Sequence, residues 1–401
     1  MALGVGGSHL TLIRGARAAA SNGDSEALAL VTIELCNSGS VALTGIEMEP
    51  VVELVKASLR SELPDGLRRM LWAASARAFV YSAMSPFGQE LYRKAFDVYE
   101  SCNQETQELI LRNSEAGLSD PDDLVLAKRA TVMIAAAADR NPELRWLARW
   151  FQFRDALISA DGDRLALAMK DIRESATQSE RRYAFVVLGQ TFDLEMQQAW
   201  AESTLAMIHD DLDRAEEEAN RALEIELKQL EVRGDGFGTG WVTSSYGLLL
   251  IAIRHRQGRL AELVDLVDTE APLIPAWRIA IVITNFAAGN IERARQELDI
   301  VCANGFELLV RDPTWTAAMW LLAEPVIELM DRLVIEALYT ALLPFADRMS
   351  YSGLCTFGPV RDSLALLADA LGDNAGANEH RRLSAVMTTQ LRERSAWANG
   401  E

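Results

Sequence analysis

Residues 212–230 read LDRAEEEANRALEIELKQL, and this stretch decides the fold class. Its apolar residues recur at steps of three and four, which places them on one face of an α-helix. That face consists of Leu212, Ala215, Ala219, Ala222, Leu223, Leu227 and Leu230. Charged residues fill most positions between them, as is typical of a solvated outer face. The stretch therefore predicts an amphipathic helix with one buried side.

The same spacing recurs over much of the chain, for example in residues 291–302 and 333–343. Strand signals are weak, and no β runs alternate with helices as a parallel sheet would require. We therefore expect an all-α protein.

A recurrent turn separates the helical stretches. Most copies carry a glycine, which can end a helix in the left-handed conformation, and one copy has Asp210 instead. The turn glycines are Gly23, Gly162, Gly258, Gly289 and Gly372. An apolar residue follows each turn by five positions and is expected to dock the next helix; these residues are Leu28, Leu167, Ala215, Leu263, Ala294 and Ala377. The pattern predicts repeated αα-hairpins.

Irregular repeats of this length are typical of degenerate tetratricopeptide-like hairpins. Residues 188–192 (LGQTF) also resemble the first-helix core of that repeat. We expect a right-handed tetratricopeptide-like α-solenoid of about eighteen helices. Residues 1–48 are expected to form an N-terminal helical hairpin and loop, and residues 49–401 the solenoid.

The charge balance argues against nucleic acid as a direct partner. The chain of 401 residues carries a net charge of −19. A nucleic-acid binder normally shows a basic stripe, whereas the basic runs here are short, such as Arg254-His255-Arg256. The same charge would be repelled by an anionic membrane surface.

Cysteine usage and hydropathy predict a cytoplasmic protein. The four cysteines are far apart and form no C-x-x-C pair, which favours reduced, apolar side chains. No run of about 18 uncharged apolar residues is present, and the N-terminus does not read as a signal peptide.

Several short phrases carry a resemblance to a known group of proteins. They include residues 288–298 (AGNIERARQEL), 311–315 (RDPTW), 342–348 (LLPFADR), 355–360 (CTFGPV) and 364–372 (LALLADALG). These phrases resemble the long helical C-terminal region of large bacterial regulators with an ATPase core. That group includes the maltose-regulator-like, LuxR-type transcriptional activators and the actinobacterial adenylate cyclase–ATPase fusions.

The chain departs from this group in its functional motifs. It has no G-x-x-x-x-G-K-[ST] phosphate loop, no cyclase domain and no terminal helix-turn-helix; residues 383–401 continue as one amphipathic helix. The resemblance, which spans roughly residues 55–375, therefore implies the sensor or coupling solenoid alone, either as a stand-alone protein or as part of a longer regulator.

The candidate binding residues lie in residues 145–154 (RWLARWFQFR). Arg145 and Arg149 are four residues apart on one helix face, so they could clamp an anionic ligand or a peptide carboxylate. Trp146 and Trp150 accompany them, and arginine with tryptophan is typical of binding hot spots. The alternative is a buried aromatic stripe with solvated arginines.

Other candidate sites are weaker. The acidic cluster of residues 210–218 lacks the ligand spacing of a calcium loop, and the glycine run of residues 234–240 lacks the lysine and preceding strand of a phosphate loop. The histidines are isolated, and no G-x-S-x-G elbow is present. We therefore expect no catalytic residue, no cofactor and no metal.

Three functions follow as hypotheses. The leading one is a regulatory binding module that recognises a protein partner or effector in its concave groove. The second is a small-molecule sensor whose groove closes on its ligand. The third is an enzyme with an unrecognised groove site, which would require clustered groups with strongly shifted pKa values.

Overall fold

The computed structural model describes residues 5–37, 47–118, 121–141, 144–177, 183–187, 190–233, 239–268 and 276–396. The chain forms two compact units. Unit 1 comprises Met1–Leu147, Tyr183–Asp193 and Glu224–Thr243, and unit 2 comprises Ala148–Arg182, Leu194–Leu223 and Ser244–Glu401.

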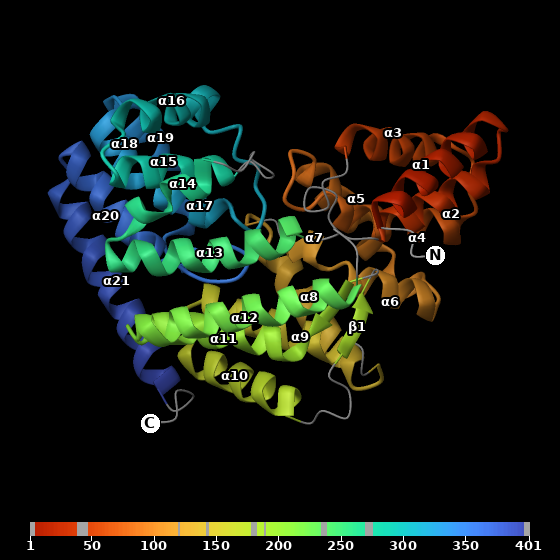
Figure 1. Ribbon diagram of the computed structural model, residues 1–401, viewed down its shortest axis with the longest axis horizontal. Helices are drawn as coiled ribbons and strands as arrows, with labels where there is room; N and C mark the ends of the chain where they lie inside the picture. The colour runs from red at the N-terminus through yellow and green to blue at the C-terminus, as the bar shows by residue number, and fades with distance from the viewer. Residues whose placement is uncertain are drawn as a thin grey trace. The chain divides into compact units, whose positions relative to one another are not determined.

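The elements up to residue 147, together with the strands, are short helices and one hairpin (Figure 1). They are α1 (Val5–Ser21), α2 (Ser25–Cys36), α3 (Met48–Arg60), α4 (Asp65–Ala78), α5 (Ser85–Asp97), η2 (Tyr99–Ser101), α6 (Gln104–Arg112), α7 (Glu115–Leu118), α8 (Leu124–Ala138), β1 (Tyr183–Val187) and β2 (Gln190–Asp193).

The remaining elements are almost all helices. They are α9 (Arg145–Ile158), α10 (Gly162–Thr177), α11 (Leu194–Ile208), α12 (Leu212–Arg233), α13 (Thr239–Gln257), η4 (Leu260–Leu263), α14 (Val264–Asp268), α15 (Trp277–Ala287), α16 (Ile291–Cys302), η5 (Ala303–Gly305), α17 (Trp315–Leu321), α18 (Ala323–Leu329), α19 (Arg332–Leu342), η6 (Leu343–Phe345), α20 (Val360–Leu371) and α21 (Asn374–Ser395). The predicted all-α class is confirmed.

The antiparallel hairpin β1–β2 corrects one detail of the sequence analysis. Residues 188–192 were expected in the first helix of a repeat, but Gln190–Asp193 is a strand paired with Tyr183–Val187. Residues 188 and 189 lie outside the described part of the chain. The composition of β1 explains the difference, since four of its five residues are β-branched or aromatic and favour extended backbone, and Thr191 and Phe192 are of the same kinds in β2.

No helix in the described part of the chain is long and apolar enough to cross a membrane.

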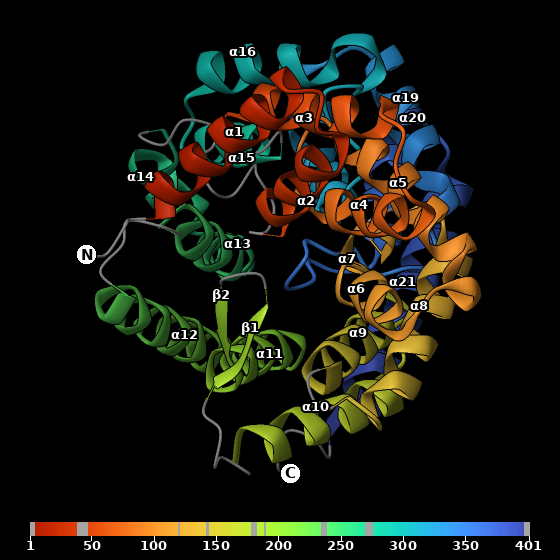
Figure 2. The same cartoon turned by 90° about the vertical axis from the view of Figure 1, so that its right-hand side faces the viewer.

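Helices α1 and α2 pack against each other and against the next helices along the chain. Most of the loop expected before residue 49 lies outside the described residues. Gly23 adopts a φ of 70° between α1 and α2, and Asp24 caps α2 by accepting from the Ala27 N–H at 2.9 Å. Helix α2 packs against α3 and α4 (Figure 2). The hydroxyls of Thr32 and Ser58 meet at 3.1 Å between α2 and α3.

Most predicted turns carry the left-handed residue where it was expected. Gly23, Gly258, Gly289, Gly372 and Asp210 all have positive φ. The apolar residues five positions after these turns are buried, namely Leu28, Ala215, Leu263, Ala294 and Ala377.

The turn before α10 was misplaced by two residues. Its left-handed residue is Ala160, with a φ of 53°, while Gly162 is the first residue of α10. The docking position therefore moves from Leu167, which is 56% exposed, to Leu165, which is fully buried. The sequence misled here because glycine is the usual residue for this conformation, and alanine adopts it only at a steric cost.

Two buried glutamates each bind two arginines between the helices of unit 2. Glu202 on α11 accepts from Arg173 on α10, at 2.5 and 2.7 Å, and from Arg214 on α12, at 3.1 Å. Glu297 on α16 pairs in the same way with Arg278 at 2.6 Å and Arg293 at 2.9 Å. Charges can be buried here because each carboxylate meets guanidinium groups in hydrogen-bonding geometry.

The last helix of unit 2 packs against one of its first. Helix α21 lies along α20 and also against α10 (Figure 1). Its Leu391 joins a core formed by Leu157, Leu165 and Ile208 from α9, α10 and α11. In an open solenoid each repeat contacts only its neighbours, so this contact is an addition to the repeat pattern.

Gly162 makes that contact possible and supplies the first prediction. A Cβ at this position would lie 2.7 Å from the Leu391 carbonyl oxygen and 2.7 Å from the Arg394 Cβ. We expect Gly162→Ala to lower the free energy of unfolding by about 1–3 kcal/mol, because backbone must move to relieve the clash. Chemical denaturation followed by circular dichroism measures this loss.

Gly66→Ala is the matched control. Gly66 is also near the start of a helix, but a Cβ there meets nothing within 4 Å. Its stability should stay the same or rise by up to about 1 kcal/mol, because alanine favours the helix. Equal stability of the Gly162→Ala variant and the wild type would contradict the close packing of α21 on α10.

Candidate functional site

The predicted binding residues of α9 are engaged within the fold. Arg145 donates from Nε to the Ala138 carbonyl oxygen at 3.3 Å, and Trp146 is buried. These two residues belong to unit 1, whereas Arg149 and Trp150 belong to unit 2.

In unit 2, Arg149 donates to the Ser175 hydroxyl on α10. The Trp150 ring stacks on Phe153 at 5.4 Å and lies 6.1 Å from Trp200 on α11. Trp146 is buried and Trp150 is partly buried against an apolar core, as in the alternative interpretation, and both arginines make hydrogen bonds inside the protein. A ligand clamp at this position stays a prediction.

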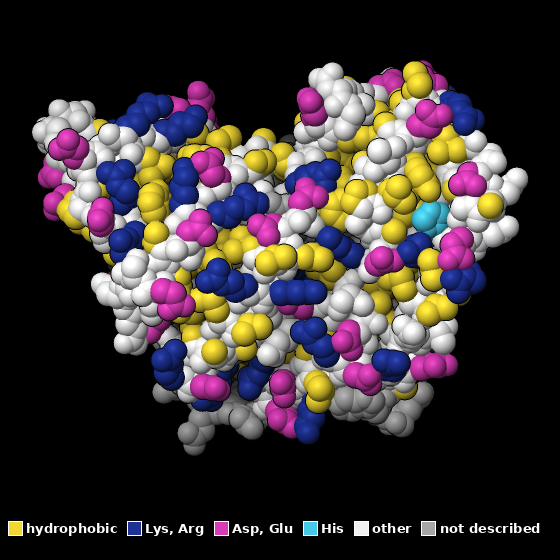
Figure 3. All heavy atoms as spheres, turned by 180° about the vertical axis from the view of Figure 1, so that it is seen from behind, with side chains coloured by type: hydrophobic (Ala, Val, Ile, Leu, Met, Phe, Trp, Pro, Cys, Tyr) yellow, Lys and Arg dark blue, Asp and Glu magenta, His cyan; other side chains and the backbone are white. Residues whose placement is uncertain are grey.

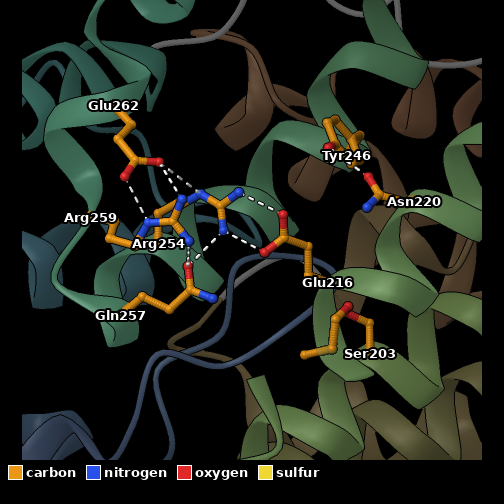
Figure 4. Close-up of polar contacts among 9 residues, drawn as sticks. Ser203, Glu216, Asn220, Tyr246, Arg254, Gln257, Arg259 and Glu262 are labelled. Atoms are coloured by element: carbon orange, nitrogen blue, oxygen red, sulfur yellow. Dashed lines mark hydrogen bonds and ion pairs between the residues drawn. The ribbon is translucent and has the colours of Figure 1, made fainter. Parts of the chain in front are cut away.

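One residue of the acidic cluster, Glu216, and one of the basic triplet, Arg254, meet in a polar network (Figure 4). Arg254 at the end of α13 donates two hydrogen bonds to Glu216 on α12, at 2.5 and 2.6 Å. These bonds lower the pKa of the Glu216 carboxyl. Arg254 also donates to Gln257 at 2.6 Å, and Arg259 pairs with Glu262 on η4 at 2.7 and 2.8 Å.

Two further contacts join the same helices. The Tyr246 hydroxyl donates to Asn220 at 2.9 Å, and the Ser203 hydroxyl donates to the Ala215 carbonyl oxygen at 2.7 Å (Figure 4). Together they fix α13 against α12 and α12 against α11. Part of the cluster expected to be solvated thus stabilises the packing of helices.

The next two residues of α13 point elsewhere. The His255 ring meets the Trp320 and Phe357 rings at 5.2 and 6.3 Å, and burial lowers the pKa of this imidazole. Arg256 donates to Asp210 at 3.1 Å, and Asp210 also pairs with Arg392 of α21. All three residues of the basic triplet therefore make contacts with other residues of unit 2.

A non-helical segment lies inside unit 2, and we call residues 349–359 the plug. Every plug residue except Gly353 is buried. The plug closes on itself, since the Ser350 N–H donates to the Gly358 carbonyl oxygen at 2.8 Å. Sequence reasoning missed this segment as a structural unit, although its two glycines, its proline and its lack of helical spacing were available as a signal.

Side chains of the surrounding helices hold the main chain of the plug. The Thr316 hydroxyl of α17 accepts from the Tyr351 N–H at 3.0 Å and donates to the Tyr351 carbonyl oxygen at 3.2 Å. The Trp320 indole donates to the Pro359 carbonyl oxygen at 2.9 Å, and the Thr204 hydroxyl of α11 donates to that of Leu354 at 3.5 Å. Side chains of α11 and α17 thus bind the backbone of a non-helical segment.

A small hollow lies beside the plug. It has a volume of about 30 Å³ and is bounded by α13, α15, α17 and the plug. Its walls are almost wholly apolar and include Leu248, Ile251, Ala280, Ile283, Ala317 and Phe357. Trp277 also lines it, and the buried Nε1 of this residue has no hydrogen-bond partner among the described residues.

A buried carboxyl lies next to the hollow. Thr314 lines the hollow, and its N–H and hydroxyl donate to Asp312 at 2.8 and 2.6 Å. Asp312 is 2% exposed, and burial raises its pKa from 3.8 to about 6 despite these hydrogen bonds. Within the described residues, no group of three or more His, Cys, Asp or Glu side chains is placed to hold a metal ion.

Charges of both signs are intermixed on the face drawn in Figure 3.

The glycine run of residues 234–240 falls largely outside the described residues. The hollow has apolar walls, and the helices around the plug carry hydrogen-bond donors in fixed positions. Both features suit the binding of a ligand or a partner segment. Comparison with family models and with curated proteins returned no match.

Thr316 supplies a prediction about the plug. Thr316→Val removes the partner of both main-chain groups of Tyr351, so we expect a loss of about 1–3 kcal/mol in the free energy of unfolding. Amide hydrogen exchange at Tyr351 should become faster. The control is Thr340→Val, since this exposed hydroxyl on α19 bonds only to the Glu336 carbonyl oxygen of its own helix. An unchanged exchange rate in Thr316→Val would show that this hydroxyl does not hold the plug.

Asp312 supplies a prediction about pH. The folded protein holds this proton more tightly than the unfolded chain does, so ionisation costs stability as the pH rises through about 6. The wild type should therefore lose up to about 3 kcal/mol relative to Asp312→Asn between about pH 4 and about pH 7. Urea melts over this range measure the difference. Parallel pH profiles of the two proteins would be the contrary result, and Asp213→Asn, an exposed change on α12, is the control.

Proposed function

We propose that the chain is a non-catalytic binding module of a bacterial signalling or transcriptional regulator. Its helical hairpins would form a tetratricopeptide-like array that recognises an extended segment of a protein partner. It would work in the cytoplasm without contacting nucleic acid directly. The observation that carries this proposal is the plug, a non-helical segment held through its main chain by side chains of helices.

The contacts with the plug support recognition of backbone. Thr204, Thr316 and Trp320 contact carbonyl oxygens or N–H groups, which any extended segment presents. Helical-repeat arrays commonly use their inner faces for binding. The plug side chains Tyr351 and Phe357 fill spaces between the helices, so selectivity would come from side-chain pockets as it does in other modes of peptide recognition.

The plug also sets a condition on binding. Because the plug already engages these side chains of α11 and α17, a partner segment must bind beside it or replace it. Only molecules in which the plug is displaced could bind a segment that replaces it. The apparent affinity for that segment would equal its intrinsic affinity multiplied by the fraction of such molecules. A substitution that weakens the contacts holding the plug in place should therefore raise the apparent affinity for such a partner.

The hollow beside Trp277 favours a second candidate function, that of a small-molecule sensor. Its walls are apolar and one of them belongs to the plug. A ligand there would act on the same segment that the partner hypothesis uses.

The test is capture of partners from lysate of the source organism with the tagged chain, followed by mass spectrometry. We expect one regulatory protein to be enriched by the wild type and by Thr340→Val. Enrichment should be stronger with Ser350→Ala, which removes the hydroxyl that accepts from the Phe357 N–H inside the plug at 3.2 Å and leaves Thr316 free to bind the partner. The enriched protein is then purified and its affinity for the three chains measured by calorimetry. If no protein is enriched over a tag-only control with any of them, the partner hypothesis fails.

A further inference from the structure

We propose that acidification loosens the base of the plug through His380, which acts with Arg361 and Asp347 as a proton-sensitive lock. The lock stands on the hydrogen bonds that join these three side chains. Its effect on the capture of a partner rests on the proposed function, whereas the lock itself is testable without any partner.

The two ends of the plug are tied together just outside it. The Val360 N–H donates to the Arg348 carbonyl oxygen at 2.9 Å. One residue further out on each side, the guanidinium group of Arg361 on α20 pairs with the Asp347 carboxylate. Arg361 therefore closes the base of the plug.

The same guanidinium group donates to a buried histidine of the last helix. Nη1 of Arg361 lies 3.1 Å from Nδ1 of His380 on α21, a residue that is 7% exposed. Arginine has donors only, so Nδ1 must be an acceptor without a hydrogen. The proton of the neutral ring is then on Nε2, which donates to the Tyr339 hydroxyl of α19 at 3.2 Å. This geometry requires an uncharged His380.

A second proton on the ring would break the arrangement. A hydrogen on Nδ1 removes the acceptor of the Arg361 hydrogen bond and sets a positive charge beside the guanidinium group. The Arg361 side chain is only 13% exposed, so solvent screens this repulsion poorly. Arg361 must turn away, and its pairing with Asp347 changes with it because one guanidinium group makes both contacts.

The charged and titratable groups around His380 act in both directions. They are Tyr339 on α19, Arg361 on α20, and Glu379 and Asp373 on α21 and its cap. Burial, and then the charge of Arg361, lower the pKa of His380 below its ordinary value of 6.5, while Asp373 and Glu379 oppose this shift. Both carboxylates are engaged elsewhere, in the cap of α21 and in an ion pair.

The direction of the pH effect follows from this lowered pKa. An open form with His380 in water binds the proton more tightly than the closed form does, so opening is favoured as the pH falls below 6.5. The equilibrium constant for opening should rise by up to about tenfold per pH unit, until the pH reaches the pKa of the closed form. Under the proposed function, capture of a segment that replaces the plug should strengthen in mild acid.

The test follows the ring and the base of the plug separately in the full chain. Histidine labelled with ¹³C at Cε1 is titrated between about pH 5 and about pH 8, the range in which imidazole changes charge. Hydrogen exchange of peptides covering residues 345–362 is measured by mass spectrometry and corrected for its intrinsic pH dependence. In His380→Gln the amide still accepts from Arg361 and donates to Tyr339 but does not take up a proton.

We expect His380 to titrate below 6.5 in the wild type, and its pKa to rise in Arg361→Met, which removes the neighbouring cation. Exchange at the base of the plug should become faster as the pH falls, by up to about tenfold per pH unit. In His380→Gln this pH dependence should be absent.

Two variants control for other groups that titrate nearby. His255 meets the plug at Phe357, and Asp362 on α20 accepts from the Ser384 hydroxyl on α21. His255→Gln and Asp362→Asn should both retain the acid response at the base of the plug.

Three results would overturn the proposal. They are a pKa of His380 at or above 6.5, an unchanged pKa in Arg361→Met, and an acid response that persists in His380→Gln. If His380→Gln does not fold, the two pKa measurements still decide, since the resonance of His380 is the one that survives substitution of His9, His209 and His255. No partner is present in this experiment, so its failure and a failed capture of partners are independent results.

Discussion

Buried backbone without helical hydrogen bonds is the constraint on which unit 2 depends. The plug lies inside a helical unit, where an unpaired N–H or carbonyl group is costly. It meets this constraint partly by closing on itself and partly through Thr316 and Trp320 on α17 and Thr204 on α11. The Met349 N–H completes the arrangement by donating to the Ile158 carbonyl oxygen at the end of α9, at 2.9 Å. The positions of α9, α11, α17 and the plug are thus set by one set of hydrogen bonds.

Charge plays a second, supporting part. Glu202 and Glu297 are each almost fully buried between two arginines, and Asp210 joins Arg256 of α13 to Arg392 of α21. Such ion pairs fix how the helices are oriented more than they add to the net free energy of unfolding, because desolvation offsets much of their attraction. In these pairs the glutamates are buried and the arginines stay partly exposed, and most of the pairs join two different helices.

The same features connect the fold to binding. Side chains of α11 and α17 already hold the backbone of a non-helical segment, so they include the hydrogen-bonding groups that the proposed partner segment would need. The plug, the hollow and His255 share Phe357, so a ligand in the hollow and a partner at the plug would act on one element. Coupling of this kind requires that each ligand prefer a different seating of the plug.

The sequence by itself determined the helices, most of the turns and the hairpins. Gly258, Gly289 and Gly372 ended helices where they were expected to, because a left-handed turn and an apolar stripe depend on residues within a few positions of each other. The left-handed Ala160, the use of Arg254 and Glu216 as a pair, the seating of the plug and the packing of α21 on α10 did not follow from it. The last three depend on groups far apart in the chain, whose meeting is fixed by the closing of the helical unit and the need to satisfy buried polar groups. The left-handed Ala160 is a local turn in which alanine takes the conformation that usually belongs to glycine. Only the tertiary structure decided them, and with them the place of the candidate site.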